Sequence, residues 1–472
     1  MAQGNTCGIR QIMLVINNLI VSKTWQAECT REGMTAQHIT DQSSNRKGNT
    51  MKTKLACFAI IVTLILVATA GAQTVATGDS RSVSQPSFPA VCQTLSAQFT
   101  TSQRSAPPSS DDTSRIQAAL TSCAGTGKSV VLAASGSYNA FISAMLTVNG
   151  EGLVVNSGVT LEGNINTYKS QAELVYVEGT NSFIGGPGAI DGCGDIIASG
   201  STPRLVQTNN ASNFIIYDVT LQQAAHPNLY IQGGSGATVW SVTIRTPATR
   251  ANADGIDIDS ISDVTVNNST VEAGDDGIAV KTNESAASNI TVENSQFYGT
   301  HGLSVGSQTF DGVTNVLFKS NYVYGTDLLG NVSANANGLN VKTDSECGGL
   351  VKQVTYQNNC LYGVKHLIVV NAAYGSCSGT TGTPQFQDIL INGVVSESSL
   401  SGAYSEFFGY SSGYLAQVYL ANVSLDVTKQ SGDEYATVYL DNANITPSGT
   451  DVTTSSFSTS GSVPSCSFTT SD

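Results

Sequence analysis

Residues 255–269 read Gly255-Ile-Asp-Ile-Asp-Ser-Ile-Ser-Asp-Val-Thr-Val-Asn-Asn-Ser269 and contain two short strand patterns in succession. In each pattern apolar residues alternate with polar ones, which is typical of a strand that buries one face. The first pattern recurs three times, always after a glycine: Gly277-Ile-Ala-Val-Lys-Thr282, Gly302-Leu-Ser-Val-Gly-Ser307 and Gly338-Leu-Asn-Val-Lys-Thr343. The chain therefore carries an internal repeat.

The second pattern also recurs, and its spacing gives the period of the repeat. If Phe214, Thr238, Val264, Ile290 and Val316 are equivalent, they lie 24, 26, 26 and 26 residues apart, and weaker copies follow at Val354 and Ile389. A fixed period of this length with several short strands indicates a solenoid. We therefore predict an all-β fold, a single-stranded parallel β-helix.

Alternation along the first pattern predicts which side chains face the interior of the coil. The inward set is Ile256, Ile258, Ile278, Val280, Leu303, Val305, Leu339 and Val341. The outward set is Asp257, Asp259, Ala279, Lys281, Ser304, Gly306, Asn340 and Lys342.

The residues that precede the four glycines are Asp254, Asp276, His301 and Asn337, and Asp275 lies one position further back. On stacked strands about 4.8 Å apart these residues form one column. Three carboxylates and an imidazole at one place suit acid/base cleavage of a polymer. The alternative is that they are solvated turn residues, since Asp-Gly is a common turn pair.

A helix is expected over Asp111–Cys123, with Ile116 and Leu120 on one face. It begins with good N-cap residues. Because the open end of a solenoid needs a cover, we expect a short N-terminal capping helix. An ordinary surface helix is the alternative.

The N-terminal part has the pattern of a secretory signal peptide. Met51-Lys-Thr-Lys54 is basic, Leu55 to Ala68 is apolar, and Ala70-Gly-Ala72 resembles a cleavage site. We expect residues 1–50 to be an upstream extension, 51–72 the signal peptide, 73–85 a loose linker and 86–472 one β-helix domain. The alternative is a true extension with an internal anchor. If residues 51–72 are a signal peptide that is removed, the protein is expected to be extracellular and to have no membrane partner.

Residues 73–472 contain 14 basic and 32 acidic residues, a net charge of −18. This charge argues against nucleic acid and anionic membranes as partners. Oligomerisation has no support in the sequence, so a monomer is expected.

Seven cysteines remain after residue 72: Cys92, Cys123, Cys193, Cys347, Cys360, Cys377 and Cys466. In a secreted chain we expect Cys92 to pair with Cys123 and two of Cys347, Cys360 and Cys377 to pair. No Cys-x-x-Cys pair occurs, so we expect neither a zinc site nor another metal or cofactor.

Four ordered motifs resemble those of the polygalacturonases, glycoside hydrolase family 28. They are Asn252-Ala-Asp254-Gly, Gly274-Asp-Asp276-Gly, His301-Gly302 and Asn340-Val-Lys342, where the family reads Asn-Thr-Asp, Asp-Asp, His-Gly and Arg-Ile-Lys. The similarity runs from about residue 86 to near the C-terminus and is greatest to bacterial-type members. The resemblance implies a right-handed coil and inverting hydrolysis of α-1,4-linked galacturonan, a pectic polysaccharide.

The resemblance also implies a role for each matched residue. Asp275 would be the general acid, Asp254 and Asp276 would activate the attacking water, and His301 would support the acid. The residues expected to contact substrate are Asn252, Asn340, Lys342 and Tyr374. Lys342 could instead be an ordinary outward lysine, as Lys281 could be, and Asn252 could simply stack with its neighbours.

Asn340 departs from the family motif, which has arginine there. Arginine binds a carboxylate through two parallel hydrogen bonds and asparagine cannot. Besides plain polygalacturonate, a decorated pectin such as xylogalacturonan or rhamnogalacturonan is therefore a candidate substrate. Two further alternatives are a polysaccharide lyase and a non-catalytic glycan-binding β-helix.

Overall fold

The computed structural model describes residues 12–16, 19–23, 73–197, 203–376 and 382–468. The predicted signal peptide lies outside these residues. Near the N-terminus, β1 (Ile12–Ile16) and β2 (Leu19–Lys23) pair antiparallel in a unit of their own. The other described residues belong to the second unit. No helix among the described residues is long and apolar enough to cross a membrane.

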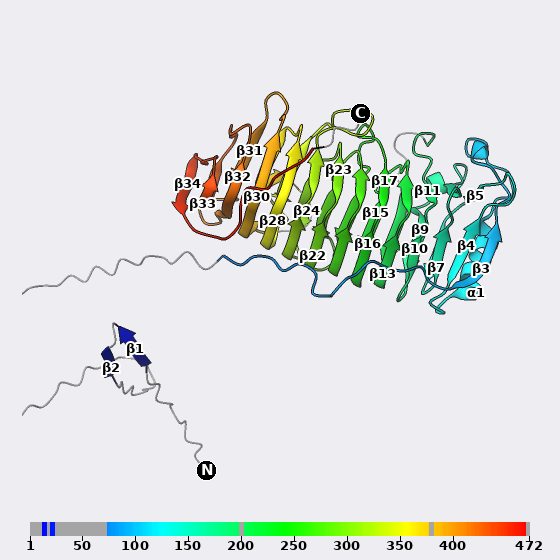
Figure 1. Cartoon of the computed structure of the whole chain (residues 1–472), viewed down its shortest axis with the longest axis horizontal. Helices are drawn as coiled ribbons and strands as arrows, with labels where there is room; N and C mark the ends of the chain where they lie inside the picture. The colour runs from blue at the N-terminus through cyan, green and yellow to red at the C-terminus, as the bar shows by residue number, and fades with distance from the viewer. Residues whose placement is uncertain (1–11, 17–18, 24–72, 198–202, 377–381, 469–472) are drawn as a thin grey trace, which may run out of the picture. The chain divides into compact units, whose positions relative to one another are not determined.

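The second unit is a right-handed parallel β-helix in which strands stack in three columns along one long axis (Figure 1). The fold prediction is confirmed. The first column begins with β3 (Val91–Ser96) and β4 (Ser129–Ala133) and continues with β7 (Gly152–Val155), β10 (Phe183–Gly185), β13 (Ser212–Tyr217), β16 (Ser235–Trp240), β19 (Ser262–Asn267), β22 (Ala287–Glu293) and β25 (Val313–Lys319).

The second column consists of shorter strands. They are β5 (Ala140–Ser143), β8 (Thr160–Gly163), β11 (Ala189–Asp191), β14 (Thr220–Gln222), β17 (Thr243–Arg245), β20 (Thr270–Glu272), β23 (Gln296–Tyr298) and β26 (Tyr322–Tyr324). β28 (Leu350–Tyr362) continues both columns, because it pairs with β25 and with β26. The first column ends with β30 (Gln385–Glu397), β32 (Ala416–Ser424), β33 (Glu434–Ala443) and β34 (Thr450–Ser456).

The third column carries the predicted site. Its strands are β6 (Leu146–Asn149), β9 (Glu173–Glu178), β12 (Arg204–Asn209), β15 (Leu229–Gln232), β18 (Ile256–Asp259), β21 (Ile278–Thr282), β24 (Leu303–Thr309), β27 (Asn337–Asp344), β29 (His366–Gly375) and β31 (Tyr404–Phe408). All eight residues predicted to face inward lie in the hydrophobic core and are at most 1% exposed.

Two details of the repeat differ from the prediction. Phe214 pairs with Ala237, and Ala237 pairs with Val264, so Ala237 and not Thr238 belongs to the equivalent set. The outward set is also largely buried, because turns and neighbouring side chains cover it: Asp257, Ser304 and Asn340 are at most 1% exposed.

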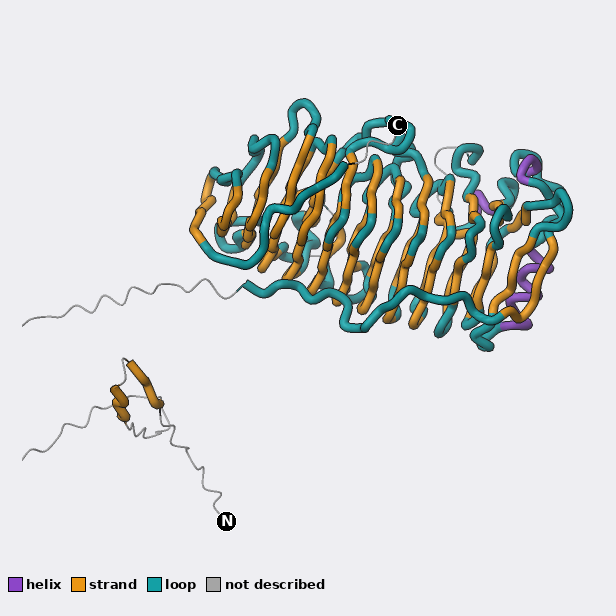
Figure 2. The backbone as a smooth tube through the Cα atoms, in the orientation of Figure 1, coloured by secondary structure: helices purple, strands orange, loops and turns teal. Residues whose placement is uncertain are grey.

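The predicted helix is α1 (Thr113–Cys123), and it lies at the N-terminal end of the coil (Figure 2). Ile116 and Leu120 are fully buried, as expected, and the helix packs against β3, β4 and β6. Asp112 does not cap the helix with its side chain; that carboxylate accepts hydrogen bonds from Arg115 and from the backbone N–H of Ile142. The described residues also include two short 3₁₀ helices, η1 (Thr101–Gln103) and η2 (Tyr168–Ser170).

The expectation of a loose linker over residues 73–85 is wrong. The segment lies extended across the first column and is bonded to successive turns (Figure 1). Backbone N–H groups of Ala76, Thr77 and Gly78 donate to Thr355 and Asn315. Its Ser/Thr/Gln-rich composition cannot build a core, and hydrogen bonds hold most of it, while the adjoining Phe88 adds ring contacts with Phe183 and Tyr217. We call residues 74–88 the N-terminal strap.

Two residues that bond the strap, Asp263 and Asn315, belong to a ladder with left-handed backbone that also includes Asn213 and Asn289, with φ between 54° and 61°. Asparagine and aspartate tolerate this conformation better than other non-glycine residues. Asn315 Oδ1 accepts from the N–H of Thr77 at 2.7 Å and of Gly78 at 3.0 Å, and its Nδ2 donates to Gly78 O at 3.0 Å.

We expect Asn315→Ala to destabilise the protein by about 3 kcal/mol, since it removes strap hydrogen bonds worth about 1 kcal/mol each and places alanine in the left-handed region. Asn213→Ala is the matched control, because it carries the backbone cost alone. Urea unfolding of both variants measures the difference. Equal losses in the two variants would show that the strap adds no stability.

Cys92 pairs with Cys123, as predicted. Of the three cysteines among which a local bridge was expected, Cys347 is disulfide-bonded and Cys377 lies outside the described residues. The third, Cys360, pairs with Cys466, a bridge that was not predicted. The tail that follows β34 runs back along the coil and brings Cys466 to β28. Cys193 is a buried free thiol.

Candidate active site

The predicted column exists, and strand register creates it. Ile256 pairs with Ile278, Ile278 with Leu303, and Leu303 with Leu339. The residues two positions before these are Asp254, Asp276, His301 and Asn337. They therefore occupy the same place on β-strands stacked about 4.8 Å apart.

A pocket of about 440 Å³ opens over this column. Six of the eight predicted site residues line it: Asn252, Asp254, Asp275, Asp276, Lys342 and Tyr374. The other two do not line the pocket: His301 contacts Asp275, and Asn340 contacts Ser304.

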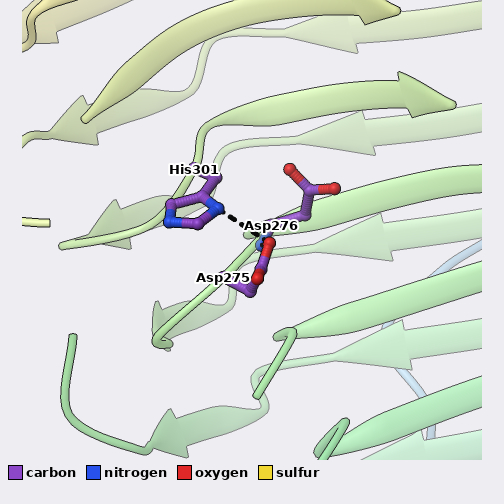
Figure 3. A group of neighbouring side chains, drawn as sticks. All are labelled: Asp275, Asp276 and His301. Carbon is purple, nitrogen blue, oxygen red and sulfur yellow. Dashed lines mark hydrogen bonds and ion pairs between the residues drawn. The ribbon is translucent and has the colours of Figure 1, made fainter. Parts of the chain in front are cut away.

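Asp275 is bound to His301. Its Oδ1 lies 2.7 Å from His301 Nδ1, and its backbone oxygen accepts the His301 N–H at 2.7 Å. Figure 3 shows the imidazole beside Asp275, while the Asp276 side chain leaves the same turn in another direction. Burial opposes ionisation of Asp275, but the hydrogen bond and charge of His301 and the charge of Lys342 outweigh it and lower the pKa of Asp275.

Asp276 is bound to Lys342 and Ser304. Lys342 Nζ lies 3.1 and 3.0 Å from its two carboxylate oxygens, and Ser304 Oγ donates at 2.7 Å. Asp276 is 4% exposed and Lys342 is 5% exposed. Burial raises the pKa of Asp276 in spite of the lysine. The adjacent carboxylates thus have pKa values shifted in opposite directions, and in the free protein Asp275 is the more readily ionised of the two.

Asp254 shares a lysine with a third buried carboxylate. Lys281 Nζ lies 3.0 Å from Asp254 Oδ2 and 2.9 Å from Asp257 Oδ1. Burial and the nearby Asp254 charge raise the pKa of Asp257 well above its usual range. Burial opposes the charge of Lys281, but the carboxylates outweigh it and raise the pKa of the lysine. The cluster Asp254–Lys281–Asp257 is referred to as the lysine bridge.

The sequence did not predict the lysine bridge, because it offered no role for Lys281 beyond that of an ordinary outward lysine. One sequence pattern could have predicted the bridge: Asp257, Asp259 and Lys281 occupy outward positions on adjacent strands, beside Asp254. Alternation predicts their direction, but it does not predict that Asp257 is 1% exposed.

Asn340 does not contact the pocket. Its Nδ2 donates to Ser304 Oγ at 3.2 Å, so it supports the group that supports Asp276. Tyr374, in contrast, is 50% exposed, and Lys342 Nζ lies 4.9 Å from the centre of its ring. Asn252 is exposed at the rim of the pocket.

Three carboxylates also raise the question of a metal. Single ligand atoms of Asp275, Asp276 and His301 lie within 4.8 Å of one another. His301 and Lys342 already pair with these carboxylates, and we assign no metal to the group.

Comparison with known proteins identifies the family. Residues 123–446 match the family model described as glycosyl hydrolases family 28. The chain belongs to glycosyl hydrolase family 28. As a family 28 member it is a glycoside hydrolase, and the predicted resemblance is confirmed.

Relatives of the family 28 chain include bacterial enzymes. It is 33% identical over 359 residues to an endo-polygalacturonase from Pectobacterium carotovorum subsp. carotovorum, covering 68% of this chain and 83% of the relative. It is 30% identical to a polygalacturonase from Ralstonia solanacearum, covering 66% and 72%. The solved polygalacturonase from Erwinia carotovora ssp. carotovora matches with a TM-score of 0.65 and 30% identity, covering 78% of this chain and all of that structure.

Proposed function

We propose that this family 28 hydrolase cleaves α-1,4-galacturonosyl linkages in pectin with inversion at the anomeric carbon. The observation that carries the proposal is the meeting of Asp254, Asp275 and Asp276 in one pocket, each paired with a separate cationic or imidazole group. The relatives named as polygalacturonases supply the substrate class.

Asp275 is proposed as the general acid. In the free protein its bond to His301 lowers its pKa, so it needs a change on substrate binding to hold a proton. A substrate carboxylate beside Lys342 supplies that change, because it adds negative charge near Asp275 and excludes water. The acid is thereby protonated when substrate is present, and His301 keeps its carboxyl in position.

Asp254 and Asp276 are proposed to hold and activate the attacking water. They occupy the same register position on neighbouring strands, and each is held by its own lysine. In inverting glycosidases acid and base are roughly 6.5–9.5 Å apart, which leaves room for that water. Asp275 and Asp276 have ligand atoms within 4.8 Å of each other, so Asp254, on the neighbouring strand, is the carboxylate proposed to lie at this separation from Asp275.

Lys342, Tyr374 and Asn252 are proposed to contact the sugar. The ammonium group of Lys342 can attract a uronate carboxylate, and the exposed ring of Tyr374 offers a surface for stacking. Asn340, given its buried position, is proposed to act on substrate only through Ser304 and Asp276. Assays on plain and decorated pectin measure whether this indirect contact of Asn340 affects the choice of substrate.

The test of the function is reducing-end release from polygalacturonate, xylogalacturonan and rhamnogalacturonan. We expect release from polygalacturonate, without a product that carries a conjugated double bond, which excludes a lyase. Release from a decorated pectin alone would establish the alternative substrate. No release from any polymer would overturn the proposal and favour a glycan-binding protein.

We also propose that the protein is secreted as a monomer, with residues 51–72 as its signal. The cysteine pairs Cys92–Cys123 and Cys360–Cys466 fit an oxidising compartment. Expression of the full chain, followed by N-terminal sequencing of the exported product, tests this. A mature N-terminus near Gln73 would place the start of the product directly before the N-terminal strap.

The pH profile of kcat/KM should fall on both sides of a mildly acidic optimum. Since burial raises the pKa of Asp276, this base becomes protonated at a higher pH than an ordinary aspartate, and activity is lost as pH falls through that pKa. As pH rises, Asp275, whose pKa is lowered, gives up the proton that it must donate. Initial rates across pH 3–9 measure the profile, and activity that rises steadily toward alkaline pH would contradict it.

A further inference from the structure

The pocket has three basic side chains besides histidine, namely Arg204, Lys281 and Lys342. The two lysines are already bound to carboxylates. Arg204 forms no ion pair with any carboxylate of the described residues. Its Nη1 donates to Gln207 Oε1 at 2.7 Å, and its Nε has no hydrogen-bond partner in this part of the chain.

Arg204 is nevertheless held in place. Its guanidinium carbon lies 4.0 Å from the centre of the Tyr230 ring, and the Tyr230 hydroxyl donates a hydrogen bond to Asp259. Its backbone N–H donates to Ala172 O at 2.8 Å. Glu173 pairs with Arg204 across the strands but lies beyond ion-pair distance. The side chain is therefore ordered without being neutralised.

Strand register places Arg204 in the catalytic column. Val206 pairs with Leu229, and Leu229 pairs with Ile256. The residues two positions earlier are Arg204, Pro227 and Asp254. Arg204 thus lies two strands before Asp254 at the same position, which corresponds to roughly 9–10 Å along the coil.

The pocket needs such a cation if its ligand is anionic. Four aspartates line it, Asp254, Asp257, Asp275 and Asp276, and Lys281 and Lys342 offset only part of their charge. The arginine that the family motif places at position 340 is absent. A guanidinium can bind a carboxylate in a fork geometry that lysine cannot match.

We propose that Arg204 binds a carboxylate of a uronate unit at the N-terminal side of the pocket and so determines specificity for uronate polymers. The inference rests on the proposed function and adds a second carboxylate contact to Lys342. His226, which also lines this side of the pocket, has its pKa lowered by burial. It therefore faces the same sugar as a neutral hydrogen-bonding group.

The test compares Arg204→Gln and Arg204→Lys with Arg245→Gln, which removes the same charge from an exposed arginine at the end of β17. KM and kcat on polygalacturonate are measured first. In an Asp275→Asn background, calorimetry then measures binding of trigalacturonate and of its methyl ester. Thermal unfolding of each variant verifies the fold.

We expect Arg204→Gln to raise KM about 10- to 100-fold with a smaller change in kcat, because a charge-assisted hydrogen bond to the bound polymer is lost. Binding of trigalacturonate should weaken by a similar factor, binding of the methyl ester should weaken little, and Arg204→Lys should recover part of the loss. Arg245→Gln should behave like the parent protein.

An unchanged KM in a folded Arg204→Gln protein, or an equal loss for acid and ester, would overturn the assignment. If the parent protein does not cleave polygalacturonate, the proposed function fails on its own. The acid-versus-ester comparison then still decides whether Arg204 binds a carboxylate.

Discussion

Asp275→Asn should lower kcat on polygalacturonate by about 10³-fold while the protein stays folded. A general acid contributes roughly 10²–10⁴-fold, and asparagine has nearly the same shape but no proton to give. The side chain lies 24% exposed at the pocket wall, so the change creates no cavity and buries no new charge. Reducing-end release measures kcat, and thermal unfolding measures the fold.

An activated substrate separates the acid from the bases. A galacturonide with a nitrophenyl leaving group needs little protonation, so Asp275→Asn should lose much less activity on it than on the polymer. Asp276→Asn should lose activity on both substrates, because the water still needs a base. Asp311→Asn, at an exposed turn, is the control. If Asp275→Asn retained polymer cleavage, Asp275 would not be the acid.

Lys281→Met should have the second large effect, on both activity and stability. It leaves Asp254 and Asp257 buried without the cation that both contact. Removing one partner of a buried ion pair costs about 3–5 kcal/mol, and we expect kcat to fall about 100-fold because Asp254 is no longer held in place. Urea unfolding and polygalacturonate kinetics measure the two effects.

A second substitution separates stability from positioning. Adding Asp257→Asn to Lys281→Met removes the more deeply buried of the two unpaired carboxylates, so stability should partly return while activity stays low. Lys319→Met, at the end of β25 away from the pocket, controls for the loss of a lysine. Recovery of activity together with stability would mean that the lysine bridge is only structural.

The column of Asp254, Asp276 and His301 was predictable because it depends on local alternation and on a constant period. The pairing of Ile256, Ile278 and Leu303 follows from that pattern, and it fixes Asp254, Asp276 and His301 in one line. The capping position of α1 was predictable for a similar reason, since its apolar face needs a partner.

Features that depend on what covers a side chain were not predictable. Alternation places Asn340 and Lys281 on the outer surface, but only the three-dimensional turns show that Asn340 is buried behind Ser304 and that Lys281 bridges two carboxylates. The N-terminal strap was missed because its hydrogen bonds to the coil join residues 132–314 positions apart, as for Gln85 with Tyr217 and Thr74 with Asp388. No local pattern encodes such contacts.

The N-terminal strap has a consequence for the order of folding. Its residues leave the ribosome before any of the turns they bind, and the partner of Thr74, Asp388, follows more than 300 residues later. Contacts this distant in sequence form slowly, since the whole intervening chain must first be arranged. The strap can therefore be completed only after the turn that carries Asp388 has formed, and until then the first residues of this segment lack their hydrogen-bond partners.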